Sequence, residues 1–477
     1  MEKLAQFFKL KENNTTIRTE IMAGITTFMA TAFTILAIPG MIAGDDDRIR
    51  NAVFIAACLS AVFGTLLKAF YAKIPFVQAP GMGLGAYFSG AVMGGMATLA
   101  GAEYLTRLEQ YQMALALVFI AGVIFTFSTL FGIRNAIIEA IPKNIKLAMG
   151  AGIGLFITLL GLRFSGIVVG SPSTFVTLVN FRNVGLIGAD YASHGADYAA
   201  IAASGRQALG AILALGGLLL ITVLSIMKVK GAILIGVLLT TIATYVFGVV
   251  SMPADFSFNL GSRFADFFEL SFLQMDFSFI NESTNWGTLL AFVLAFIFVN
   301  MLDALGTIYG ISSANGMVDK DGKVIGLEKG LTADALGTAA SGLLGTSTVT
   351  TVVSSASGIS EGGRTGLTAL TAAVLFFFAL ILAPFVVLIP NVAVAPALIY
   401  VGFLMVSHVK EVDFSDPTEA FPAFLTVVIM PLTFSIANGI AFGLISYIVI
   451  KTFTGRVKEV KLLAVIIALL FVLQYIL

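Results

Sequence analysis

Residues 298–366 read FVNMLDALGTIYGISSANGMVDKDGKVIGLEKGLTADALGTAASGLLGTSTVTTVVSSASGISEGGRTG, and two features of this stretch conflict with its apolar surroundings. Asp303 lies inside an apolar run long enough to cross a bilayer, where a carboxylate is costly and usually functional. Further along, from Gly345 to Gly358, an apolar segment gives way to Thr, Ser and Gly. Irregular polar backbone at membrane depth survives only where it is buried in protein or lines a cavity. Together these features predict a substrate pocket near the middle of a membrane.

The composition places the chain in a membrane. Of its 477 residues, 58% are hydrophobic and 11% are charged, whereas soluble domains carry about 25% charged residues. The formal net charge is zero, so nothing indicates binding to nucleic acid. Cys58 is the single cysteine, which excludes an intramolecular disulfide, and the two histidines, His194 and His408, lie in no metal-ligand cluster. We therefore expect an all-α polytopic membrane protein, with the lipid bilayer around it and no metal or cofactor.

Fourteen segments are apolar enough to enter a bilayer core about 30 Å thick. Eleven of them are interpreted as full helical spans, near residues 20–43, 51–72, 112–133, 145–162, 207–227, 231–250, 287–312, 366–389, 394–408, 419–436 and 437–453. Three are shorter and rich in Gly, Ser or Thr, at residues 80–97, 330–345 and 347–359. Residues 462–477 form a last apolar segment, which is either a fifteenth span or an interfacial helix.

The two halves of the chain look alike. The segment 51–97 ends a helix at Pro75 and continues through QAPGMGLGAYFSG, while 330–359 ends a helix at Gly345 and continues through TSTVTTVVSSASG. Seven spans followed by seven spans must have inverted topology, because seven is odd. Inverted repeats with helices interrupted at matching positions indicate a transporter site.

The loops predict the orientation. Basic residues precede the first span, follow the fourth, separate the sixth from the seventh and follow the fourteenth, whereas the loop 252–286 is mainly acidic. All the basic groups fall on one side, so the positive-inside rule predicts a cytoplasmic N-terminus. We expect a multi-pass protein of the plasma (cytoplasmic) membrane.

The first interruption is predicted to start a half-helix near Pro80. Proline suits a first helical turn and the glycines allow close backbone approach, so the half-helix would point its amide groups into the membrane centre. Such amide groups suit an anionic or carbonyl-rich ligand, and aromatic rings can stack on a flat one. A glycine-rich helix packed closely on a neighbour is the alternative. The expected pocket residues are Gly85, Ala86 and Phe88, and Tyr87 is a second ring that could stack on a flat ligand.

The second interruption carries eight hydroxyl side chains between Gly345 and Gly358. Hydroxyl groups can satisfy a broken helix by bonding to its own backbone, but eight of them exceed that need. We expect some to face ligand or water, and a second half-helix to begin near Thr346 and to meet the first. The expected ligand contacts are Val353, Ser354 and Ser355.

Asp303 is the most specific single candidate. Asn300 lies one turn before it and Thr307 one turn after it, on the same helix face. The carboxylate can accept ring N–H bonds or carry the coupling proton; a structural hydrogen bond to a neighbouring helix is the alternative. The inverted repeat pairs this helix with the first span, which adds Thr31 and Phe33 to the expected pocket.

Two other ionisable residues are expected to be structural. Lys68, near the end of the second span, is predicted to extend its amine toward the membrane surface. Asp334, in the sequence KGLTADALG, is predicted to have a structural or capping role.

Several motifs resemble those of the nucleobase:cation symporter family, in its adenine/guanine/hypoxanthine permease branch, over essentially the whole chain. They are PGMGLGAYF, VNMLDALGTIYG, LTADALGT, LLGTSTVTT, GGRTGLTA, FPAFLTVVIMPLTFSIANGIAFGLISY and GSPSTFVTL. The resemblance implies a seven-plus-seven inverted repeat and proton-coupled uptake of a nucleobase, usually by a dimer. It also implies a core domain of residues 20–133 and 287–389 and a gate domain of residues 145–251 and 394–453. The apolar segment 462–477 is predicted to be an additional helix outside this scheme.

Pocket positions depart from the family pattern. Asp303 keeps the family's acid, but Asn300 replaces an aspartate one turn before it. Gly85 stands where the family has asparagine, and Val352 and Ser354 stand where it has tyrosine and glutamate. A serine cannot accept two ring N–H bonds as a carboxylate does. The ligand is therefore either a purine bound through fewer contacts or a different molecule.

We interpret the chain as a secondary active transporter of the elevator type for a purine base or a related small heterocycle. Protons are the expected coupling ion, with sodium not excluded, and a homodimer is expected. Two alternatives stay open: a carrier of another small metabolite or an anion on the same scaffold, and a non-transporting receptor or passive channel. An enzyme is disfavoured, because no nucleophile–base pair, metal cluster or phosphate-binding loop is present.

Overall fold

The computed structural model describes residues 2–131, 141–171, 174–186, 197–251, 259–281, 284–317 and 324–476. The first half of the chain forms α1 (Glu2–Phe7), α2 (Ile17–Thr31), α3 (Phe33–Ala43), α4 (Asp47–Leu66), β1 (Gln78–Pro80), α5 (Met82–Tyr87), α6 (Met93–Ala100), α7 (Arg107–Leu130), α9 (Lys143–Phe164), β2 (Val168–Ser171), β3 (Phe175–Leu178), α10 (Asp197–Ile226), α11 (Ala232–Val246) and α12 (Leu260–Leu270). Two π-helical turns, Leu67–Ala72 and Phe88–Val92, extend α4 and α5, and Phe181–Leu186 is a 3-10 helix.

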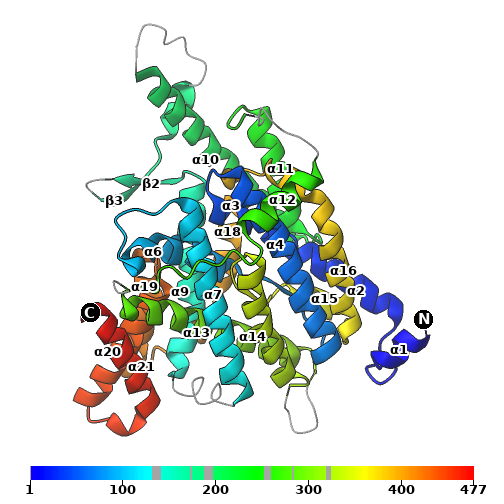
Figure 1. Ribbon diagram of the computed structural model, residues 1–477, viewed down its shortest axis with the longest axis vertical. Coiled ribbons are helices and arrows are strands. Elements are labelled where there is room, and N and C mark those ends of the chain that lie inside the picture. Colours follow the sequence, from blue (N-terminus) through cyan, green and yellow to red (C-terminus); the bar gives the residue numbers. More distant parts are fainter. Residues whose placement is uncertain are drawn as a thin grey trace.

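The second half is also helical (Figure 1). It forms α13 (Trp286–Ala314), α14 (Leu327–Leu344), β4 (Val349–Thr351), α15 (Ser355–Ser360), α16 (Gly366–Ala379), α17 (Ala383–Val386), α18 (Asn391–Val406), α19 (Pro417–Leu432), α20 (Ile436–Phe453) and α21 (Leu462–Ile476). Short 3-10 helices cover Leu380–Leu382, Ser407–Glu411 and Val457–Glu459.

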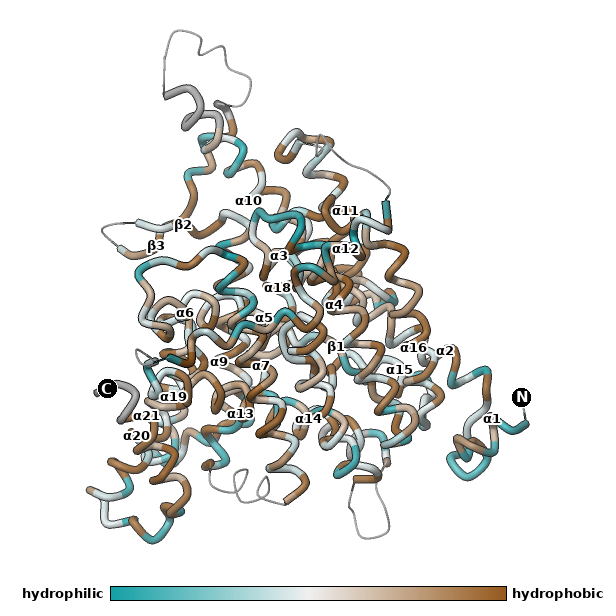
Figure 2. The backbone as a smooth tube through the Cα atoms, in the orientation of Figure 1, coloured by the Kyte–Doolittle hydropathy of each residue, from teal (hydrophilic) through white to brown (hydrophobic). Residues whose placement is uncertain are grey.

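Long apolar helices dominate the fold. Within the described residues, nine helical segments are long and apolar enough to cross a membrane, and three shorter apolar helices lie beside them. Figure 2 shows hydrophobic colouring along the helices, with hydrophilic colouring gathered in the connections. The prediction of a helical multi-pass membrane protein is therefore confirmed at this level, while the layout of fourteen spans in two inverted repeats stays a prediction.

Polar residues at helix starts explain several helix boundaries. Asp46 precedes α4, and its carboxylate accepts hydrogen bonds from the N–H groups of Arg48 and Ile49. Thr106 and Glu109 form a reciprocal capping box at the start of α7. Gly345 ends α14 with φ +98°, a backbone conformation that favours glycine.

The helices pack in several groups. Helix α14 packs against α7, α4 and α13, while α16 packs against α2 and α4. Helix α9 packs against α18 and α19, and α10 against α11 and α18. The C-terminal helix α21 packs against α13 and α20. The predicted domain boundaries at 133 and 477 fall outside the described residues, and the division into core and gate domains stays a prediction.

Candidate functional site at a crossing of two interrupted segments

Two extended segments from opposite halves of the chain meet as an antiparallel pair. In the pair β1–β4, Gln78 lies opposite Thr351 and Pro80 opposite Val349. Backbone hydrogen bonds continue the pairing on both sides, from Gly81 N–H to Thr348 O at 3.3 Å and from Val352 N–H to Val77 O at 3.1 Å. All three residues of each strand are buried. Each segment thereby satisfies backbone groups that its interrupted helix leaves free.

The second half-helix begins later than the sequence predicts. Helix α15 starts at Ser355, not near Thr346. Within the segment between the two helices, Val349–Thr351 form strand β4 instead, because pairing with β1 satisfies their backbone. The first half-helix starts close to its expected position, since α5 begins at Met82. The β1–β4 pair itself lies near the middle of the molecule, beside α4 and α14 (Figure 2).

Four hydroxyl groups at this crossing are buried without a hydrogen-bond partner within the described residues: those of Thr346, Ser347, Thr348 and Thr350. Each of these residues is at most 1% exposed. Buried polar groups are normally hydrogen-bonded, and a cluster of unpaired ones is where water or a ligand can be bound. These hydroxyl groups are therefore the clearest sign of a binding site in the described part of the chain.

Ser354 contacts the first membrane helix. Its hydroxyl lies 2.7 Å from Thr31 Oγ1, and Thr31 Oγ1 donates to Thr27 O at 2.7 Å. Because Thr31 has a single hydroxyl proton, Ser354 is the donor in the contact between the two side chains. Thr31 is the last residue of α2 and Phe33 is the first of α3, so the contact lies where this helix is itself interrupted.

The two residues beside Ser354 differ in burial: Ser355 is buried and Val353 is exposed. Ser355 is buried and accepts a hydrogen bond from Val77 N–H at 3.1 Å, which ties α15 to the chain entering β1. Val353 is 58% exposed. The backbone on either side of Ser354 therefore has one anchored and one accessible residue.

Gly85 lies against the second interruption. A Cβ atom at this position would lie 3.5 Å from Ser347 Oγ and only 2.1 Å from Ile38 Cδ1. Gly85 thus brings α5 close both to α3 and to one of the unpaired hydroxyl groups. The adjacent Ala86 is completely buried.

The aromatic residues of the first interruption are packed inside the protein. Phe88 is completely buried and meets Tyr111 edge to face, with ring centroids 6.3 Å apart. Tyr87 meets Phe296 of α13 in the same manner at 5.2 Å. Phe33 is 5% exposed and belongs to the main apolar core. These rings are therefore packed side chains of the apolar core.

Helix α13 carries the predicted polar face. Asn300 is completely buried; its Nδ2 donates to Thr338 Oγ1, while its Oδ1 has no hydrogen-bond partner within the described residues. The Thr338 hydroxyl donates to Asp334 O at 2.9 Å, and its Oγ1 also lies 3.4 Å from Val349 O, which places Asn300 beside β4. One turn later Asp303 is partly buried, and Thr307 is buried a further turn along.

A buried ion pair adjoins β4. Lys68 Nζ lies 2.7 Å from Asp334 Oδ2 and donates to Gly330 O at 2.7 Å, and both ionic side chains are completely buried. The prediction that Lys68 extends to the membrane surface is therefore wrong, because the carboxylate of α14 provides a partner in the interior. The structural role predicted for Asp334 agrees with this pairing.

The contacts of two polar side chains, Glu20 and Tyr111, were not predicted from the sequence. Glu20 accepts hydrogen bonds from Thr365 and Thr368, through both backbone and hydroxyl groups, and so joins α2 to the start of α16. Tyr111 donates to Gly345 O at 2.5 Å, which closes the end of α14. Glutamate near a basic terminus and tyrosine inside an apolar helix carry no sequence signal that would have identified these contacts.

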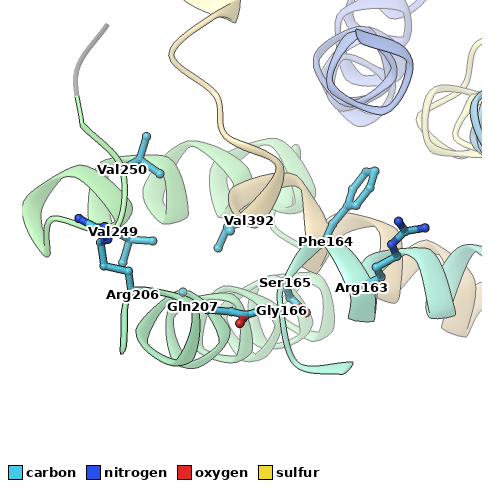
Figure 3. Close-up of a pocket in the computed structure, with 10 residues that line it drawn as sticks. Arg163, Phe164, Ser165, Gly166, Arg206, Gln207, Val249, Val250 and Val392 are labelled. Atoms are coloured by element: carbon cyan, nitrogen blue, oxygen red, sulfur yellow. The ribbon is translucent and has the colours of Figure 1, made fainter. Parts of the chain in front are cut away.

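A cavity of about 250 Å³ lies away from the crossing. It is bounded by the end of α9, by α10, by the chain after α11 and by the start of α18. Figure 3 shows Arg163 at one side of the cavity and Arg206 at the other, with Val392 between them. No residue predicted to bind the substrate lines this cavity.

Apolar helices arranged around a buried crossing of two interrupted segments define a multi-pass membrane protein. Sequence comparison adds the family: the chain belongs to the family Xan_ur_permease, described as a permease family, whose pattern matches residues 18–189 and 184–442. Permeases move solutes instead of converting them, so the expectation of a transport protein and not an enzyme is confirmed. The resemblance identified from the sequence motifs is likewise confirmed.

Full-length relatives support this membership. A putative permease of Methanocaldococcus jannaschii is 41% identical over 478 residues, covering 100% of this chain and 99% of the relative. A guanine/hypoxanthine permease of Bacillus subtilis is 36% identical, covering 98% of this chain and 99% of the relative. An adenine permease of Escherichia coli is 34% identical, covering 99% and 96%.

Solved structures support the fold. The transmembrane domain of a cyanobacterium bicarbonate transporter is similar with a TM-score of 0.61 at 17% identity, covering 88% of this chain and 97% of that one. A murine Solute Carrier 26 anion transporter in the inward-facing state is similar with a TM-score of 0.59 at 13% identity, covering 92% and 69%. At these identities the likeness concerns the fold alone.

Proposed function

We propose that this permease is a secondary active transporter that carries a purine nucleobase or a related small heterocycle together with protons. Curated relatives at 34–36% identity over nearly the whole chain are an adenine permease and a guanine/hypoxanthine permease. The proposal places the substrate at the β1–β4 crossing. It takes the chain to be a multi-pass protein of the plasma membrane with a cytoplasmic N-terminus.

The four buried hydroxyl groups without partners are the observation that carries the proposal. A purine base presents ring nitrogen atoms, N–H groups and carbonyl or amino groups around a flat ring, and hydroxyl groups can donate to or accept from each of them. The unpaired Asn300 Oδ1 is a further acceptor beside the same strand. A ligand that satisfies these groups removes the penalty of leaving them unpaired, which favours binding of a hydrogen-bonding heterocycle over an apolar molecule.

Asp303 is the proposed proton carrier. Its carboxylate lies in a transmembrane helix, one turn from Asn300, and is partly accessible. In this mechanism, a proton and the base bind from the same side, and the proton neutralises the Asp303 carboxylate before the loaded site moves across the membrane. Ser354, in contact with Thr31, supplies a hydroxyl group where a carboxylate would otherwise add a second negative charge.

The proposed movement is an elevator motion. Residues 20–133 and 287–389 would move as a core that carries the crossing, against a gate of residues 145–251 and 394–453 in a dimer. The likeness in fold to solved domains of transporters supports transport on this scaffold, and the division into core and gate is part of the proposal. The fourteen-span inverted repeat is part of this proposal.

Ligand-dependent melting of the purified protein tests the substrate class. Guanine, hypoxanthine and adenine are titrated separately, with cytosine as a smaller heterocycle and sulfate as a simple anion. A purine transporter is stabilised saturably by at least one of the three purines and not by sulfate, since stabilisation follows occupancy. Stabilisation by sulfate alone would instead favour an anion carrier on the same scaffold.

A further inference from the structure

The Lys68–Asp334 pair extends to a third buried residue. Thr351 Oγ1 lies 2.9 Å from both carboxylate oxygen atoms of Asp334, so its hydroxyl donates to the carboxylate. Thr351 is the last residue of β4 and is completely buried. A continuous chain of hydrogen bonds therefore runs from the end of α4 through α14 to β4.

These hydrogen bonds join three elements, two of which lie far from the first in the sequence. Lys68 lies in the π-helical turn after α4, Asp334 in α14, and Thr351 three residues before Ser354. Strand β4 has only three residues and pairs with a single strand of the same length. Such a short pair is marginal by itself, so other contacts must fix the position of β4.

The two faces of β4 have different surroundings. Thr351 points to Asp334, and the side chain of Val349 lies 3.1 Å from the Cβ position of Gly337, so both face α14. Thr350 points the other way, since its Cγ2 lies 3.0 Å from the Cβ position of Gly81. The positions of the unpaired hydroxyl groups of Thr348 and Thr350 are therefore set by β4. The opposite face of β4 is bonded to the ion pair through Thr351.

Buried charges in a membrane are retained where they have a specific use, and a fully buried pair is weak support for stability as such. We propose that Lys68, Asp334 and Thr351 are positioning residues: through the Thr351 hydroxyl, the ion pair fixes β4 and thereby holds Ser354 and the unpaired hydroxyl groups in the geometry that binds substrate. The binding readout of this inference rests on the proposed function, whereas its structural readout does not.

Thr351→Val and Thr351→Ser form a matched pair for the test. Valine has nearly the shape of threonine but cannot donate to Asp334, while serine keeps the hydroxyl. The structural readout is hydrogen–deuterium exchange of the segment 346–360 in the full-length protein. We expect faster exchange in Thr351→Val and wild-type exchange in Thr351→Ser, with unchanged exchange in α9 and α18.

Binding provides the second readout. The dissociation constants of guanine, hypoxanthine and adenine are measured on folded, monodisperse protein. Losing one positioning hydrogen bond should weaken binding about tenfold in Thr351→Val, and Thr351→Ser should stay near the wild-type value. If the wild type binds none of the three bases, the proposed function fails, and the exchange experiment still decides the positioning role.

If Thr351→Val does not fold, two double variants test whether the hydrogen bond from Thr351 to residue 334 positions β4. Lys68→Gln with Asp334→Asn removes both charges but leaves an amide oxygen atom that can accept from Thr351. Lys68→Met with Asp334→Leu removes the charges and the acceptor together. We expect the first double variant to keep slow exchange in 346–360 and the second to lose it. Equal exchange in the two double variants, or in Thr351→Val and Thr351→Ser, would overturn the proposal.

Discussion

The proposed mechanism depends on Asp303 for proton coupling and on Gly85 for the shape of the pocket. Asp303 is an ionisable side chain in a membrane helix, one turn from Asn300, whose amide oxygen has no hydrogen-bond partner within the described residues. A Cβ atom at Gly85 would collide with Ile38 Cδ1, at 2.1 Å, and would be in ordinary contact with Ser347 Oγ, at 3.5 Å. A substitution of Asp303 therefore tests proton coupling, and a substitution of Gly85 tests the packing of the pocket.

Replacing Asp303 with Asn should separate binding from coupling. The amide keeps hydrogen-bonding capacity but cannot take up and release a proton. We expect proton-gradient-driven accumulation to fall to background, while exchange of substrate stays within about tenfold of wild type, as expected for one altered hydrogen bond. Uptake into proteoliposomes with and without a pH gradient measures both quantities, and normal accumulation by Asp303→Asn would exclude this residue as the proton carrier.

Gly85→Asn should be destabilising by itself, because its Cβ would lie 2.1 Å from Ile38 Cδ1. Overpacking of this kind typically costs about 1–3 kcal/mol. Ile38→Val deletes the colliding atom, so the double variant should melt at a higher temperature than Gly85→Asn alone. Ile38→Val alone serves as the control. Additive melting effects of the two substitutions would show that the two positions are not in contact.

At the scale of elements, the sequence predicted where helices are interrupted, but not which segments and side chains meet at the interruptions. The glycine, proline and hydroxyl patterns located the breaks after Pro75 and Gly345, because such residues disfavour a continuous helix. The β1–β4 pairing was missed, since three-residue strands of Thr, Val and Pro carry no periodicity. Lys68 and Asp334 are 266 residues apart, and a single sequence does not show which charges meet. The start of α15 was misplaced for the same reason, as the pairing partner decides where the helix begins.

The ends of α19 and α20 form an ionic cluster that predicts a pH dependence. Hydrogen bonds from Thr418 and Arg456 lower the pKa of Asp416 to about 2, and Arg456 and Lys451 lower the pKa of Glu459. Both carboxyl groups release protons more readily in the folded than in the unfolded protein. Their contribution to stability is therefore complete above their unfolded pKa values, near pH 4, and is lost as the pH falls through their lowered folded pKa values, which for Asp416 is about 2.

The corresponding experiment is thermal melting in detergent from roughly pH 6 to pH 3, the range that brackets the unfolded carboxyl pKa values. Asp416→Asn should lower the melting temperature at pH 6 and reduce its fall on acidification. Glu411→Gln is the control, because Glu411 is exposed and has no ion pair within the described residues. An identical pH dependence in wild type and Asp416→Asn would contradict this interpretation of the cluster.

At the scale of the whole molecule, one turn bridges the two proposed moving parts. Lys230, between α10 and α11, lies 2.9 Å from Glu361, which follows α15. The next residue, Gly231, has its Cβ position 3.1 Å from Met29 Cε in α2. If the proposed core slides against the proposed gate, these contacts must separate during transport.

Crosslinking should therefore stop transport. In a Cys58→Ser background, Lys230→Cys and Glu361→Cys are joined by a short, reducible bifunctional thiol reagent. We expect uptake to fall to background and to recover on reduction, with both single-cysteine variants unaffected. Crosslinked protein that transports at the wild-type rate would show that this turn and α15 move together, which contradicts the proposed division into core and gate.

Counterflow in proteoliposomes tests most directly whether the chain is a purine carrier. Vesicles are preloaded with unlabelled guanine, hypoxanthine or adenine and diluted into a trace of the same labelled base. A carrier exchanges one base for another, so at least one purine should show transient accumulation of label above equilibrium, absent from protein-free vesicles. Label that only equilibrates at a rate independent of preloading would indicate a channel, and no protein-dependent entry of any of the three bases would contradict a purine carrier.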